Sequence, residues 1–155
     1  MLSANEFTVG SVSQASPLAL VLPRQSHEMT MLIGQSHEGP AAVILSQSHL
    51  FQWFGVEGNT SWHGLIVPDV RIEIDPESVF SPNYAQPRPG SVIRQGTQLF
   101  LAAKANSFGN FNGYDPIVLE DGLISTSNET AGFYRWQVTI GTGQEKRILQ
   151  IVSIE

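Results

Sequence analysis

Alternation of apolar and polar residues is the clearest pattern in this chain, and it has the two-residue period of β-strands. The segment Asp69–Asp75 shows it without error, with three branched apolar residues on one side and charged residues on the other. This pattern predicts a strand with one apolar and one solvated face. Ala41–Leu45 is apolar at every position, which predicts a strand buried on both faces.

Turn-forming residues divide the rest of the chain into short apolar runs. The 14 glycines and 9 prolines are spread throughout, which leaves little room for a long helix. The proline-rich segment Pro76–Gly90 is expected to be a connection, with one helical turn at Glu77–Phe80. Further strands are predicted at Phe7–Val12, Leu18–Leu22, Met29–Ile33, Leu50–Val56, Leu65–Val67, Ser91–Ile93, Gln98–Ala103 and Ile117–Leu119.

The clearest local unit is a β-hairpin near the C-terminal end. Its strands are predicted at Gly132–Ile140 and Glu145–Ile154. If residues 141–144 form the whole connection, Ile140 lies opposite Glu145. Trp136 then faces Leu149. Both strands carry apolar residues on both faces, so we expect both faces to be covered.

Together these strands predict an all-β fold. We expect an antiparallel sandwich or a partly open barrel, with at most one or two short helical turns. A chain of 155 residues has the size of one ordinary domain, and its composition shows no break. The sequence therefore predicts a single domain over residues 1–155.

Charge and cysteine usage narrow the possible partners and the compartment. The formal net charge is −6 and no basic cluster occurs, so nucleic acid is not an expected partner. The longest apolar runs are too short to span a bilayer, so we expect no membrane partner. Cysteine is absent, which excludes disulfides and thiolate chemistry. We expect a soluble, cytoplasmic protein, since the N-terminal residues lack the pattern of a signal peptide.

A short repeat places histidines at intervals that invite a metal hypothesis. Gln-Ser-His begins at positions 25, 35 and 47, and imidazole is a common metal ligand. A hairpin between these positions would put His37 at its turn, and His27 and His49 together at the far end. His27 and His49 are therefore the candidate metal ligands. The alternative is that all three histidines are ordinary loop and edge residues.

A second candidate is the loop that ends at Asp115. It combines aromatic side chains with amide and carboxylate groups, a mixture that suits peptides or sugars. The alternative is that the aromatic rings pack under the loop while Asn and Gly make its turns. The candidate ligand-binding residues are Phe108, Asn110, Phe111, Asn112, Tyr114 and Asp115.

Catalytic chemistry has little support in the sequence. No nucleophile elbow, dinucleotide fingerprint or phosphate-binding loop occurs, so we expect no catalytic residue and no cofactor. The carboxylates Asp69, Glu73 and Asp75 are explained by the solvated face of their strand. The interpretation is a non-catalytic binding or assembly module that recognises a protein or a carbohydrate through aromatic-bearing loops. These loops lie around Trp53–Trp62, Tyr84 and Phe108–Tyr114. The alternative is a small metal-dependent enzyme that uses the histidine pair.

The final strand raises the question of self-association. Ile148–Ile154 is apolar on both faces and few charges are available to protect its edge. Such a strand must be central, be covered by earlier segments, or meet a second copy. We expect a homodimer, with the C-terminal hairpin as the contact.

Overall fold

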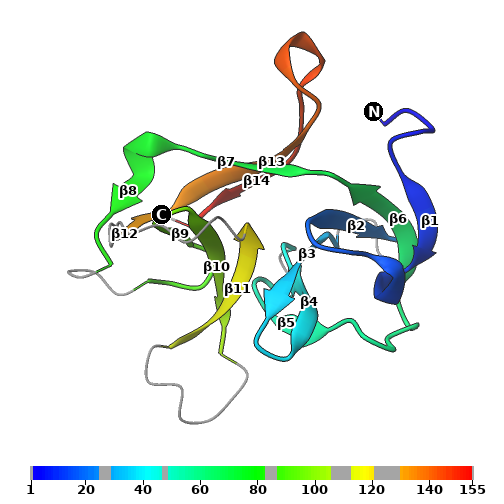
Figure 1. Cartoon of the computed structure of the whole chain (residues 1–155), viewed down its shortest axis with the longest axis horizontal. Coiled ribbons are helices and arrows are strands. Elements are labelled where there is room, and N and C mark those ends of the chain that lie inside the picture. Colours follow the sequence, from blue (N-terminus) through cyan, green and yellow to red (C-terminus); the bar gives the residue numbers. More distant parts are fainter. Residues whose placement is uncertain are drawn as a thin grey trace. The chain divides into compact units, whose positions relative to one another are not determined.

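The computed structural model describes residues 2–24, 29–46, 49–82, 87–105, 113–120 and 130–154 (Figure 1). These residues form antiparallel β-strands joined by turns and short 3₁₀ helices, which confirms the predicted all-β class. None of them belongs to a helix that is long and apolar enough to cross a membrane. The chain divides into two compact units, Met1–Val70 and Arg71–Glu155. That both belong to one domain stays a prediction.

The first unit is one antiparallel sheet with the strand order β1-β6-β2-β3-β4-β5. The 3₁₀ helix η1 (Val12–Gln14) follows its first strand. The strands are β1 (Thr8–Ser11), β2 (Ala19–Pro23), β3 (Met31–Ser36), β4 (Gly39–Ile44), β5 (Trp53–Gly55) and β6 (His63–Pro68).

Both faces of this sheet are buried at its centre. Leu20 pairs with Leu32, and Leu32 with Val43, so that three fully buried residues form a row on one face. On the other face Val21 pairs with Met31, and both are also fully buried. A sheet that is buried on both faces explains why its strands are apolar at successive positions.

The prediction for Ala41–Leu45 is confirmed, because all five residues are at most 7% exposed. The β3–β4 hairpin is tighter than the sequence suggests. Ser36 pairs with Gly39, so only His37 and Glu38 form the turn. The Ser36 hydroxyl donates to the Gly39 carbonyl oxygen at 2.8 Å and accepts from the Glu38 amide. With these bonds and the positive φ of Gly39 (123°), β3 continues past its predicted end at Ile33, and β4 begins before its predicted start at Ala41.

The second unit contains two sheets. One has the strand order β11-β10-β9-β12-β8 and the other the order β14-β13-β7. Their strands are β7 (Arg71–Ile74), β8 (Val79–Phe80), β9 (Val92–Gln95), β10 (Gln98–Lys104), β11 (Tyr114–Glu120), β12 (Thr130–Phe133), β13 (Arg135–Ile140) and β14 (Arg147–Ser153). The 3₁₀ helices are η2 (Pro76–Ser78), which overlaps the predicted helical turn, and η3 (Gly143–Glu145).

Two contacts tie the elements of the second unit together. Trp136 on β13 is 2% exposed, and its indole Nε1 donates to the Gly90 carbonyl oxygen at 2.7 Å. Phe80 stacks on Tyr134 with ring centroids 4.2 Å apart. Phe80 also covers Gly132, its cross-strand partner, where a Cβ atom would collide with the ring. The glycine therefore makes room for an aromatic ring over the sheet.

The predicted hairpin exists, but the register predicted for it is wrong. Ile140 pairs with Arg147 rather than with Glu145, and Trp136 pairs with Val152 rather than with Leu149. Two features cause the shift. Helix η3 lengthens the connection, and the register changes by one residue between Val138 and Thr139. A shift of this kind changes which side chains share a face of the sheet.

Candidate functional site

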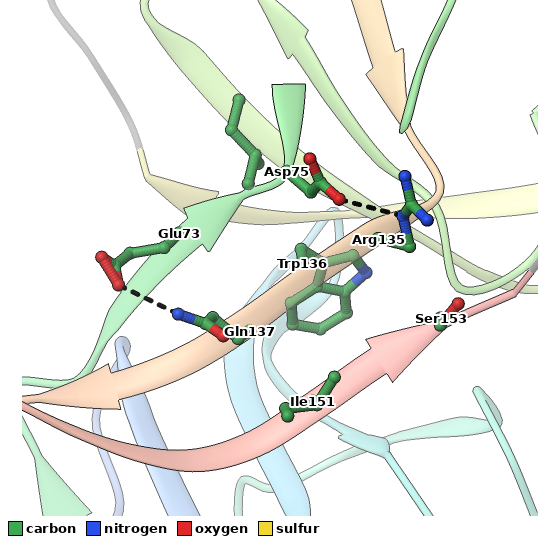
Figure 2. A pocket seen from close by; sticks show the side chains of 8 residues that line it. Glu73, Asp75, Arg135, Trp136, Gln137, Ile151 and Ser153 are labelled. Carbon is green, nitrogen blue, oxygen red and sulfur yellow. Dashed lines mark hydrogen bonds and ion pairs between the residues drawn. The ribbon is translucent and has the colours of Figure 1, made fainter. Parts of the chain in front are cut away.

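The most distinctive surface in the second unit is one face of the sheet β14-β13-β7. Gln137 at its centre pairs with Glu73 on one side and with Ile151 on the other. Figure 2 shows these side chains on the same side of the three strands. We call this surface, defined by Glu73, Gln137 and Ile151, the open face. The opposite face carries Trp136 and Val152, which are at most 5% exposed.

Two ion pairs join the segment from Arg71 to Asp75 to the C-terminal hairpin. The Nε atom of Arg135 lies 3.0 Å from Oδ2 of Asp75, and the side chains are 37% and 39% exposed. Asp75 also accepts a hydrogen bond from the Glu77 amide at the start of η2. The predicted solvated carboxylate is thus a half-buried side chain that joins two strands and begins a helical turn.

Glu73 forms the second pair. Its Oε2 atom lies 3.0 Å from Nζ of Lys146, and its Oε1 accepts from Nε2 of Gln137 at 3.2 Å (Figure 2 shows the latter). These hydrogen bonds, from Lys146 first and Gln137 second, hold the pKa of Glu73 below its ordinary value of 4.5. A carboxylate that is ionised and engaged in this way is a poor proton donor or acceptor near neutral pH. The arrangement therefore suits structure and recognition better than acid–base catalysis.

A cavity of about 320 Å³ lies beside Glu73 and the Asp75–Arg135 ion pair. Its walls combine the charged groups of Glu73, Asp75 and Arg135 with the apolar side chain of Ile151 and the hydroxyl group of Ser153. The lining residues are Glu73, Ile74, Asp75, Arg135, Trp136, Gln137, Ile151 and Ser153.

Beside the cavity, β14 presents two exposed isoleucines. Ile148 is 52% and Ile151 65% exposed. Ile151 pairs with Gln137 and Ile148 with Thr139, while Leu149 between them has no partner in the register. Because Gln137 and Thr139 are two residues apart on β13, both isoleucines lie on the open face. The unpaired Leu149 thus brings two apolar side chains together on a solvent-exposed surface.

Strand β14 also forms one end of the order β14-β13-β7. It has seven residues, lacks proline, and carries its single charge at Arg147, its first residue. Short length, proline and charge are the features that usually protect a sheet edge from pairing. By contrast, β7 at the other end has four residues and is followed by Asp75 and Pro76.

Only part of the predicted recognition loop can be placed. Phe108, Asn110, Phe111 and Asn112 lie outside the described residues. Tyr114 and Asp115 belong to β11, where they pair with Lys104 and Ala103. Asp115 is 7% exposed, and burial raises the pKa of the half-buried Tyr114. The role of this loop in ligand binding stays a prediction.

The aromatic residues of the predicted loop around Trp53–Trp62 lie in or against the core of the first unit. Trp53 is 8% exposed, while Phe54 and Trp62 pack against the buried core of the first unit. Tyr84 lies outside the described residues. The segment around Trp53–Trp62 therefore contributes to the core of the first unit, and its role in recognition stays a prediction.

The histidine pair is also only partly placed. His27 lies outside the described residues, and His49 is exposed. His37 occupies the β3–β4 turn, as predicted, and its Nε2 lies 3.5 Å from the neighbouring Glu38 carboxylate. Within the described ranges no three histidine, aspartate or glutamate side chains gather as a metal site. A pairing of His27 with His49 stays a prediction.

Sequence reasoning did not find the open face. Its ion pairs join residues 60 or more positions apart, which no local pattern reports. The exposed isoleucines were visible only as apolar residues on both faces of the last strand. Their common face depends on the unpaired Leu149, which alternation does not predict.

Comparison with known proteins places this chain beside one family. The family model described as "Uncharacterised protein y4lG" matches residues 9–155. A relative from Sinorhizobium fredii (strain NBRC 101917 / NGR234), described as "Uncharacterized protein y4lG", is 44% identical over 149 residues. The match covers 96% of this chain and 91% of that protein. No solved structure matches.

Proposed function

This chain belongs to the y4lG family, and we propose that it is a non-catalytic, polypeptide-binding module that adds a partner strand to β14. In strand addition, main-chain hydrogen bonds along a sheet edge supply affinity, and alternate side chains supply specificity. The observation that carries the proposal is the exposure of Ile148 and Ile151 on one face of a seven-residue edge strand.

The neighbouring charges support a strand partner rather than a small charged ligand. The carboxylates of Glu73 and Asp75 are each engaged by a cationic side chain of the C-terminal hairpin. A ligand that competed for these groups would have to replace existing ion pairs. An apolar strand beside β14 would cover the two isoleucines and leave both ion pairs in place.

The proposal can be tested with a displayed library of random nine-residue peptides, with the immobilised protein as bait. We expect enrichment of peptides that alternate branched apolar residues with polar ones, because such peptides fit a strand with one apolar face. Ile151→Lys should weaken their binding at least tenfold, since a charge on an exposed edge opposes strand pairing.

A matched control is available in the first unit. Val9 on β1 is 76% exposed and also lies on a strand at the end of its sheet. Val9→Lys should leave binding of the selected peptides unchanged. Equal binding of the selected peptides to the Ile151→Lys variant and to the unsubstituted protein would contradict the proposal.

A further inference from the structure

We infer that the partner strand is β14 of a second copy of this chain, paired antiparallel across a two-fold axis. This inference rests on the proposed strand addition and names the partner. A two-fold contact uses the same surface twice, so the strand must be complementary to itself. The sequence and register of β14 show whether the strand is complementary to itself.

In one antiparallel register, each exposed isoleucine of β14 lies opposite a residue of the second copy whose side chain is on the same face of the sheet. This register places Ile148 opposite the second copy's Ile151, and by symmetry Ile151 opposite the second copy's Ile148. Both residues lie on the open face, so each exposed isoleucine meets an isoleucine. Residues directly opposite on neighbouring strands have Cβ atoms about 4.5–5.5 Å apart, close enough for these side chains to cover each other.

The same register is consistent on the opposite face. It places Arg147 across from the second copy's Val152. These two residues pair with Ile140 and Trp136 of β13, which lie on the same face of that strand. A shift by one residue would instead set Ile148 against Val152, whose side chains point to opposite faces. That alternative leaves both isoleucines exposed and is disfavoured.

Charge is also compatible with this pairing. Lys146 and Arg147 lie together at the start of the strand. In an antiparallel pair, the cations of one copy lie at one end of the interface and those of the second copy at the other end. Each copy's Arg147 therefore faces an apolar side chain rather than its own counterpart. Like charges placed directly opposite each other would destabilise the pair.

The absence of cysteine from the chain makes the register directly measurable. Two variants, Ile148→Cys and Ile151→Cys, are mixed and oxidised in a glutathione buffer. In the inferred register the two thiols are opposite each other in the mixed pair. Identical residues of the two copies are three positions apart along the strands, about 10 Å, which is too far for a disulfide.

We expect the mixed disulfide to exceed either homodisulfide at least tenfold. Homodisulfides in equal yield, or no disulfide, would overturn the inferred register. The Val9→Cys variant, oxidised together with Ile151→Cys, is the control and should give no preferred product.

Light scattering separates failure of this inference from failure of the proposed function. At tens of micromolar, the unsubstituted protein and Val9→Lys should have the mass of a dimer, and Ile151→Lys the mass of a monomer. A monomeric unsubstituted protein that still binds selected peptides through β14 would overturn only self-pairing. A monomer that selects no peptide would overturn both, and a dimer that survives Ile151→Lys would overturn self-pairing through this strand.

Discussion

Ile148 and Ile151 share a face of β14 although three positions separate them. A strand with regular alternation would place residues three apart on opposite faces. Here Leu149 is an extra residue in the register, so Ile148 pairs with Thr139 and Ile151 with Gln137. The result is an apolar pair on the open face, 52% and 65% exposed, at the end of the sheet. This pair is the basis of the proposed interface.

Glu73 lies across β13 from the two isoleucines, and its lowered pKa depends on Lys146. Lys146→Met should raise the pKa of Glu73, because the lysine hydrogen bond is the largest cause of its lowered pKa. The pKa should still lie below 4.5, since the hydrogen bond from Gln137 remains. NMR titration of the Glu73 side chain would measure the change. Lys104→Met removes an equal charge from β10 and should leave this pKa unaltered.

The ion pair between Glu73 and Lys146 also predicts how the stability of the protein depends on pH. Because folding lowers the pKa of Glu73, its stabilising contribution is present above the unfolded value near 4.5 and is lost as pH falls through the folded value. Denaturant midpoints recorded from pH 6 to pH 3 should therefore fall less steeply in Lys146→Met than in the unsubstituted protein. A steeper fall in the variant would contradict the assignment of Lys146 as the partner.

The second unit also predicts a strong cost at Gly132. Gly132→Ala should destabilise the protein by about 1–3 kcal/mol, because the new Cβ atom would collide with the Phe80 ring. The cost should shrink in a Phe80→Ala background, and urea unfolding of the four proteins in this cycle would measure the coupling. Gly55→Ala is the control, since nothing lies within 4 Å of its Cβ position. Equal costs in both backgrounds would show that Phe80 is not the cause.

Trp136 offers a test of the contact that ties its sheet to Gly90. Trp136→Phe keeps an aromatic ring but removes the donor of the 2.7 Å bond to the Gly90 carbonyl oxygen. Leaving this buried acceptor without its donor should lower the free energy of unfolding by about 1–3 kcal/mol, in addition to any loss of packing. Trp62→Phe, at a half-buried position against the core of the first unit, should lower the free energy of unfolding by less. A Trp136→Phe variant as stable as the unsubstituted protein would contradict the role of this bond.

The two hairpins show what local patterns determine in this chain. Ala41–Leu45 was predicted correctly because an unbroken apolar run has one clear physical meaning, burial on both faces. The C-terminal hairpin was recognised, but its register was not. That register depends on helix η3 and on the extra residue Leu149, which are choices of backbone conformation rather than of hydrophobic pattern.

The candidate site is even harder to predict from the sequence. Asp75 and Arg135, or Glu73 and Lys146, become neighbours only when β7 joins the C-terminal hairpin. Their contact is a property of strand order, which alternation along the chain does not encode. Alternation therefore predicts the solvated face of these carboxylates but not their cationic partners.

The most direct test of the open edge is backbone amide hydrogen exchange at two protein concentrations. If β14 pairs with a second copy, exchange within Arg147–Ser153 should slow as the concentration rises from below one micromolar to a hundred micromolar. The slowing should be absent in Ile151→Lys, and β1 should exchange equally at both concentrations. Exchange in β14 that does not change with concentration, or protection that appears on β1 instead, would contradict the account.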